Sequence, residues 1–122
     1  MKLINDFFTI LDSSADQALF VSTIKINPSH IIFKGHFPGH PVTPGIVLLQ
    51  IIHELLENHL DKKLKLLAMQ HCKFLKILNP VETNQVDIKI EYEIKGDLLY
   101  IKAMGENGND IFFKFNSIYM FN

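Results

Sequence analysis

Apolar and charged residues alternate without exception across residues 86–94, where the even positions are apolar and the odd positions are charged. A period of two is typical of a β-strand with one face buried and the other in water. Turn-forming residues follow at 95–97 and 107–110, and each turn leads into another apolar-rich segment, at 98–104 and 111–121. The pattern therefore predicts three consecutive antiparallel strands in a meander.

Three segments upstream carry weaker strand signals. Residues 18–27 alternate between apolar and polar positions and end at an Asn-Pro pair. Residues 66–78 form a second candidate strand that also ends at an Asn-Pro pair, and residues 7–11 suggest a short additional strand. Proline lacks the backbone donor that a sheet requires, so we place the strand ends before these two prolines.

One segment alone has the strong pattern of a helix, and it runs from about Pro44 to about Leu60. Proline is favoured as the first helical residue, and Thr43 before it is predicted to be the N-cap. The polar residues of this segment recur at helical spacing in one narrow stripe, and the rest of the surface is aliphatic. The stripe consists of Gln50, His53, Glu54 and Glu57. A helix this apolar is predicted to be mostly buried.

These elements predict an α+β fold in which a curled antiparallel sheet wraps around one long central helix. At 122 residues the chain is long enough for one core and too short for two, so residues 1–122 are interpreted as a single domain. Such a sheet leaves its edge strands uncovered. We therefore expect a dimer in which edge strands pair into a continuous sheet.

Composition and charge argue against several classes of function. The chain is 48% hydrophobic and 20% charged, and its formal net charge of -1 provides no basic surface for nucleic acid or for an anionic membrane. The one cysteine, Cys72, excludes an internal disulfide and a cysteine-rich zinc site. His36 and His40 flank a loop glycine rather than sharing a helix face, so no metal is expected. No segment has the features of a signal peptide or of a membrane span, and we expect a cytoplasmic protein.

The most specific motif lies at residues 35–45, Gly-His-Phe-Pro-Gly-His-Pro-Val-Thr-Pro-Gly, directly before the apolar helix. It resembles the signature of the 3-hydroxyacyl-[acyl-carrier-protein] dehydratases of fatty acid synthesis, which have the hotdog fold. Residues 73–81, Lys-Phe-Leu-Lys-Ile-Leu-Asn-Pro-Val, are similar to the family's pattern on the strand after the helix. The resemblance covers most of the chain and implies a hotdog domain.

The resemblance also implies a reaction, the syn removal of water from a (3R)-3-hydroxyacyl thioester to form the trans-2-enoyl thioester. His36 matches the base that takes a proton from the carbon next to the thioester carbonyl, a task that suits an imidazole that is largely neutral at cell pH. Gly45 matches the residue whose backbone N–H, at the start of the helix, binds the thioester oxygen. Phe37 would wall the site from water, Ile46 would line a tunnel for the acyl chain, and His40 is expected at the rim.

The resemblance further implies the partners of this site. The substrate is carried on the phosphopantetheine arm of acyl carrier protein, so no separate cofactor is called for. Family members are homodimers or trimers of dimers, and the central-helix residue of each site comes from the partner subunit. We therefore expect a homodimer or a trimer of dimers whose site combines His36 of one subunit with the helix of the other.

The chain departs from the family at Gln50, where family members carry a glutamate or aspartate that helps the hydroxyl leave. A glutamine can hold the hydroxyl by a hydrogen bond but cannot give it a proton. Three interpretations follow: His36 passes on the proton while Gln50 orients the hydroxyl, or Glu54 one turn later replaces the acid, or the site is inactive. The main hypothesis is a dehydratase. The alternatives are a catalytically weak or inactive subunit that binds acyl carrier protein, and an acyl thioesterase.

Overall fold

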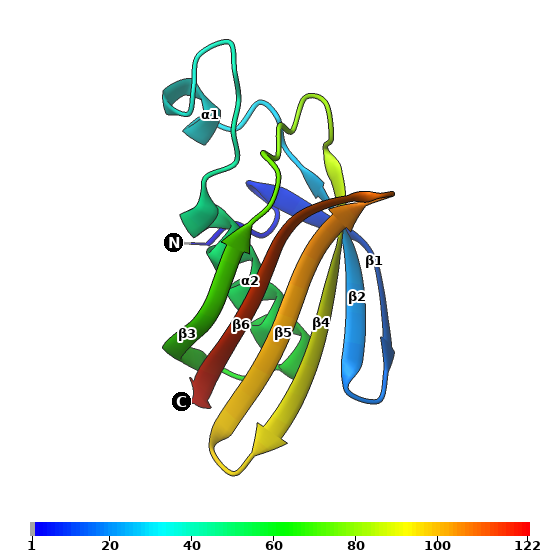
Figure 1. Cartoon of the computed structure of the whole chain (residues 1–122), viewed down its shortest axis with the longest axis vertical. Coiled ribbons are helices and arrows are strands. Elements are labelled where there is room, and N and C mark those ends of the chain that lie inside the picture. The colour runs from blue at the N-terminus through cyan, green and yellow to red at the C-terminus, as the bar shows by residue number, and fades with distance from the viewer. Residues whose placement is uncertain (1) are drawn as a thin grey trace.

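The computed structural model describes residues 2–122, and it consists of one six-stranded antiparallel sheet curled around a long helix (Figure 1). The strand order is β1-β2-β4-β5-β6-β3, so that β1 and β3 form the two edges. The elements are β1 (Phe8–Asp16), β2 (Leu19–Ile26), α1 (Ile32–Gly35), α2 (Gly45–Leu60), β3 (Leu64–Phe74), β4 (Gln85–Lys95), β5 (Leu98–Asn107) and β6 (Asp110–Phe121). The predicted α+β hotdog fold is confirmed.

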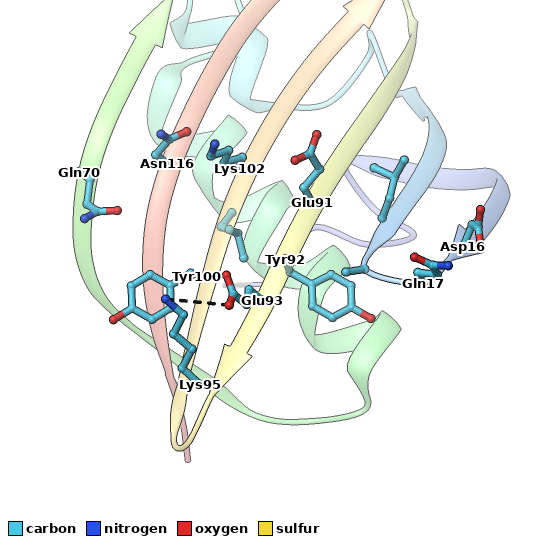
Figure 2. Close-up of a pocket in the computed structure, with 13 residues that line it drawn as sticks. Asp16, Gln17, Gln70, Glu91, Tyr92, Glu93, Lys95, Tyr100, Lys102 and Asn116 are labelled. Carbon is cyan, nitrogen blue, oxygen red and sulfur yellow. Dashed lines mark ion pairs between the residues drawn. The ribbon is translucent and has the colours of Figure 1, made fainter.

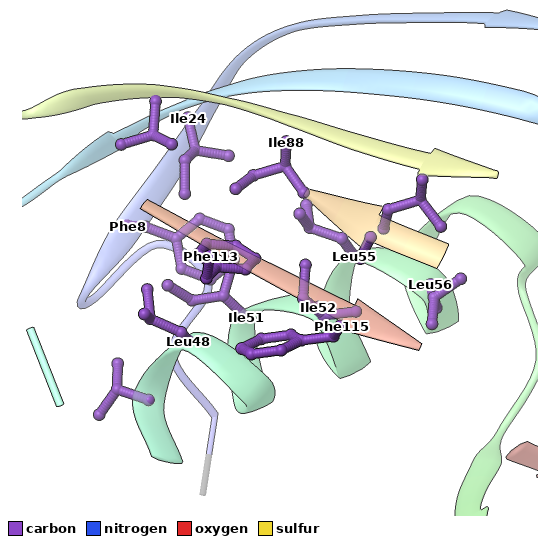
Figure 3. Packing of buried hydrophobic residues seen from close by; sticks show 14 of the residues in the cluster. Phe8, Ile24, Leu48, Ile51, Ile52, Leu55, Leu56, Ile88, Phe113 and Phe115 are labelled. Atoms are coloured by element: carbon purple, nitrogen blue, oxygen red, sulfur yellow. The ribbon is translucent and has the colours of Figure 1, made fainter. Parts of the chain in front are cut away.

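The alternation at residues 86–94 determines which face of β4 is buried. Val86, Ile88 and Ile90 are each no more than 1% exposed, and they face α2 across the core. Figure 3 shows the matching face of the helix, where aliphatic side chains including Ile51 and Leu55 point toward the concave side of the sheet. Burial of these apolar faces on each other is the main stabilising contribution to the fold.

The predicted start of the central helix was wrong by one residue. The helix α2 begins at Gly45, and Pro44 occupies the N-cap position with an extended backbone (φ -64°, ψ 146°). Thr43 is therefore not the cap. Its backbone N–H donates to the carbonyl of Leu78 at 2.9 Å, which places Thr43 in the interior rather than at the helix end.

Strands β1 and β3 end at other residues than predicted, each because of a contact outside the local pattern. Strand β3 ends at Phe74, because the N–H groups of Leu75 and Lys76 both turn to the carbonyl of Phe112. Strand β1 continues to Asp16 because its polar half pairs with β2 at an open edge, where a strand needs no apolar alternation. The short helix α1 was not predicted.

The polar stripe of α2 is engaged in contacts rather than left in water. His53 Nε2 lies 3.3 Å from Glu57 Oε2, one turn further along the helix. The same Glu57 oxygen accepts the backbone N–H of Leu64 at 2.8 Å. The C-terminal half of the stripe therefore joins the helix to the first residue of β3.

No helix in residues 2–122 is long and apolar enough to cross a membrane.

Tyr119 predicts an alkaline limit to stability. Burial raises the pKa of this side chain, on β6 against α2, to about 12. The unfolded chain releases the phenolic proton near pH 10, so the free energy of unfolding should fall by roughly 2–3 kcal/mol between about pH 10 and pH 12. Urea unfolding across this pH range measures the loss, and Tyr119→Phe should remove it. A slope that persists in Tyr119→Phe would assign it to another group.

Candidate active site

The loop between α1 and α2 folds back on itself and displays His36. Phe37 and His40 exchange two backbone hydrogen bonds, of 3.0 and 2.8 Å, around Gly39, whose φ of +78° suits glycine. The carbonyl of His36 accepts the N–H of Val42 at 2.7 Å. The backbone of His36 is thus held in place while its side chain remains exposed, with the imidazole 4.6 Å from the Phe37 ring. An imidazole placed in this way can meet a substrate without moving the loop.

The start of α2 provides the second part of the site. The first N–H groups of a helix lack intrahelical acceptors and lie at the positive end of the helix dipole, and Gly45 is the first residue of α2. The ring of Phe74 packs on this glycine so closely that an added Cβ would lie 2.5 Å from the ring. Because Gly45 has no side chain, the Phe74 ring can pack against the first residue of α2.

Apolar side chains surround this helix start and are open to solvent in the single chain. Ile46 is 70% exposed, and Phe37 and Phe74 are about half exposed. Two hollows lie on either side of the loop, one of about 440 Å³ beside Phe37 and one of about 470 Å³ beside His40. The predicted lining residues Phe37 and Ile46 are thus at the surface, where a second molecule could cover them.

Glu54 is a buried side chain of the central helix that accepts several hydrogen bonds. It is 7% exposed, and its two oxygens accept the N–H of Leu3 at 2.9 and 2.8 Å and that of Ile4 at 2.8 Å. The amide Nε2 of Gln50 donates a further hydrogen bond of 2.8 Å to the same carboxylate. Glu54 therefore fastens the N-terminal segment to α2. The sequence did not reveal this role, because the partners lie about fifty positions away.

The structure brings some of the predicted residues together and leaves others apart. His36 and Phe37 touch, and Gln50 touches Glu54. Phe74, which borders Gly45, was not predicted as a site residue, although it lies within the second family-like motif. Among the predicted residues the contacts thus form two pairs, His36 with Phe37 and Gln50 with Glu54.

A hollow larger than these two lies elsewhere, on the outer face of the sheet, as Figure 2 shows. It measures about 580 Å³ and is lined by residues of mixed charge such as Glu91 and Lys102, none of them predicted from the sequence as site residues. In the described part of the chain, no group of three or more His, Cys, Asp or Glu side chains gathers as a metal site. The loop and the start of α2 remain the candidate site.

Comparison with known proteins identifies the family of this chain. Residues 12–109 match the family model described as ApeI-like, the ApeI dehydratase. The chain is 26% identical over 102 residues to the 3-hydroxyacyl-[acyl-carrier-protein] dehydratase FabZ of Fusobacterium nucleatum, covering 80% of this chain and 70% of the relative. It is 34% identical over 106 residues to the FabZ of Chlamydia trachomatis, covering 77% of this chain and 68% of the relative.

A solved structure supports the fold. A chain of the dehydratase heterocomplex ApeI:P from Xenorhabdus doucetiae superposes with a TM-score of 0.74, covering 91% of this chain and 96% of that chain at 19% identity. The family match extends over most of the sequence and includes the loop with His36 and the start of α2. The chain belongs to the ApeI-like dehydratase family and is a distant relative of the FabZ dehydratases.

Proposed function

We propose that this chain dehydrates a (3R)-3-hydroxyacyl thioester, carried on acyl carrier protein, to the trans-2-enoyl thioester in fatty acid or related acyl-chain synthesis. The observation that carries the proposal is the exposed imidazole of His36 on a loop whose backbone is tied down and which leads into the start of α2 at Gly45. A base and an oxyanion donor are the two groups that removal of a proton next to a thioester requires.

In the proposed mechanism His36 takes the proton from the carbon next to the thioester carbonyl. The electron pair moves toward the carbonyl oxygen, where the N–H of Gly45 and the helix dipole stabilise the negative charge. The charge then returns to form the carbon–carbon double bond as the hydroxyl leaves. His36 gives its proton to that hydroxyl, so that water departs and the imidazole is neutral again.

The contacts of Glu54 favour His36, rather than Glu54, as the source of this proton. The Glu54 oxygens already accept three hydrogen bonds from two backbone N–H groups and one from Gln50. These contacts hold the carboxylate in place, so Glu54 is not available to reach the leaving hydroxyl. In this mechanism Gln50 orients the hydroxyl, and its hydrogen bond to Glu54 fixes the position of its amide.

We infer that a second hotdog chain completes the site. Ile46 and Phe74, beside the start of α2, are exposed in the single chain. Pairing at a sheet edge would cover these apolar residues and bring the helix of one chain to the loop of the other. The similar fold in a dehydratase heterocomplex supports a site shared between two chains.

Replacing the side-chain amide of Gln50 by a carboxylic acid tests the proposed dehydration. Gln50→Glu places a second carboxyl group beside Glu54, and two carboxyl groups this close tend to share one proton at neutral pH. We expect the shared proton to assist the leaving hydroxyl and to raise the dehydration rate, by up to about 10²-fold, the lower end of general-acid catalysis. Mass spectrometry of the carrier-protein thioester measures the loss of one water.

The matched control is Gln85→Glu, the same change at an exposed position of β4, which should leave the rate unchanged. If the wild-type chain and Gln50→Glu both fail to turn over, alone and as an equimolar mixture, the dehydratase proposal is refuted. A carrier protein that still binds would then favour an inactive binding subunit. Release of the free thiol in the same assay would instead favour a thioesterase.

A further inference from the structure

Residues 3–7 fold into a tight turn that contacts both helices. The carbonyl of Leu3 accepts the N–H groups of Asp6 and Phe7 at 3.0 and 2.7 Å, which closes the turn. Leu3 is 2% exposed and Phe7 is fully buried, so both ends of the turn lie in the core. The segment, which we call the 3–7 turn, is therefore fixed in the fold and can hold other elements in place.

On one side the 3–7 turn is joined to α2. The N–H groups of Leu3 and Ile4 both donate to the buried carboxylate of Glu54, at 2.8 to 2.9 Å. Glu54 lies within α2, and Gly45 is the first residue of the same helix. Because a helix is held rigid by its own backbone hydrogen bonds, the turn has a fixed position relative to the N–H of Gly45.

On its other side the 3–7 turn holds His30, which lies just before α1. Nε2 of His30 lies 3.1 Å from Oδ2 of Asp6, and Nδ1 accepts the N–H of Ile32, the first residue of α1, at 3.1 Å. Because Nδ1 accepts a hydrogen bond, the ring proton is on Nε2, which donates to Asp6. The imidazole therefore joins the turn to the start of α1 through both of its nitrogens.

The Phe7 ring supports the same contact. Its centroid lies 5.1 Å from that of the His30 ring, edge to face, and 5.4 Å from that of Phe33, a buried residue of α1. Since α1 ends at Gly35, the position of α1 determines where the backbone of His36 begins. A continuous set of contacts thus runs from α2 through the turn and α1 to His36.

We propose that the contact of Asp6 with His30 positions the His36 imidazole relative to the start of α2. The two groups that act on the substrate in the proposed mechanism, the His36 imidazole and the Gly45 N–H, lie on different elements, and the 3–7 turn joins these elements. Asp6 and His30 are not reacting groups in this role. The effect on catalysis rests on the proposed function, whereas the link from Asp6 to the loop that carries His36 does not.

Two substitutions break the link in different ways. Asp6→Ala removes the acceptor of the Nε2 proton. In His30→Asn the side-chain oxygen can still accept the N–H of Ile32, as Nδ1 does, but the side chain is too short to reach Asp6. We expect each variant to lower kcat about tenfold, because a small misplacement of a reacting group is costly, and to leave KM within about twofold. The double variant should lose no more than either single one, since both remove the same hydrogen bond.

Two control variants test whether this hydrogen bond itself matters. Asp6→Asn keeps an oxygen that accepts the Nε2 proton of His30, so it should keep at least about half of the wild-type kcat. Asp12→Ala removes an exposed aspartate of β1 and should leave kcat unchanged. The assay follows the loss of one water from a 3-hydroxyacyl carrier-protein thioester, and circular dichroism confirms that each variant is folded at the assay temperature.

A second measurement needs no turnover. In proton–nitrogen correlation spectra, the ring signals of His36, identified by their absence in His36→Ala, should shift in Asp6→Ala and in His30→Asn and stay unchanged in Asp12→Ala. If the wild type does not dehydrate the thioester while these signals shift, the proposed function fails and the link stands.

Three outcomes would overturn the proposal. One is a set of His36 ring signals that is the same in Asp6→Ala, His30→Asn and the wild type. Another is a wild-type kcat in both variants. The third is a loss of kcat in Asp6→Asn as large as in Asp6→Ala, which would show that the hydrogen bond to His30 is not what the reaction needs.

Discussion

Replacing His36 by alanine is expected to lower the rate of dehydration by about 10²–10⁴-fold, the usual contribution of a positioned acid or base. The His36 imidazole is proposed both to take the proton from carbon and to give it to the leaving hydroxyl. The alanine variant therefore loses both proton transfers. The fold should be unaffected, because the loop is held through the His36 carbonyl, which alanine retains. The measurement is turnover of a 3-hydroxyacyl carrier-protein thioester, followed as loss of one water.

The control for this variant is His40→Ala in the same loop. His40 is also exposed and its backbone also closes the turn, but it is expected at the rim of the site rather than in it. We expect His40→Ala to keep the wild-type rate. Equal losses in the two variants would mean that the loop, and not the imidazole of His36, is what the reaction needs. The midpoint of urea unfolding should match the wild type in both.

Replacing Glu54 by alanine is expected to lower the free energy of unfolding by about 3 kcal/mol or more, the largest stability effect of the variants considered. The substitution leaves the backbone N–H groups of Leu3 and Ile4 without an acceptor next to the core, and each such loss costs about 1–3 kcal/mol. The substitution also removes the hydrogen bond that the Gln50 amide donates to Glu54. The measurement is the urea midpoint together with the slope of the transition.

Two measurements distinguish the loss of these particular Glu54 hydrogen bonds from the loss of any surface carboxylate. Glu91→Gln, at an exposed position of β4, should change the free energy of unfolding by less than about 0.5 kcal/mol. Hydrogen exchange at Leu3 and Ile4 should accelerate in Glu54→Ala, because their N–H groups lose their acceptor. If Glu54→Ala is as stable as the wild type, residues 3–4 are held to α2 by apolar packing and not by the carboxylate.

Local patterns in the sequence were enough to predict the layers of the fold and to indicate a candidate site. The alternation at residues 86–94 is a local consequence of the pleat, since neighbouring side chains of a strand point to opposite faces. The aliphatic surface of residues 45–60 likewise allows only a buried helix, whatever surrounds it. Turn residues then set the order of the last three strands, and the loop motif indicated His36 in the loop before that helix.

The contacts of the polar side chains of α2 could be found only in the folded chain. Helical spacing placed Gln50 and Glu54 on one stripe, but the N–H groups that occupy Glu54 come from residues 3–4. The end of β3 and the interior position of Thr43 likewise depend on Phe112 and Leu78, which are distant in the sequence. Hydrogen bonds between distant residues leave no periodic trace, so a local pattern cannot predict them.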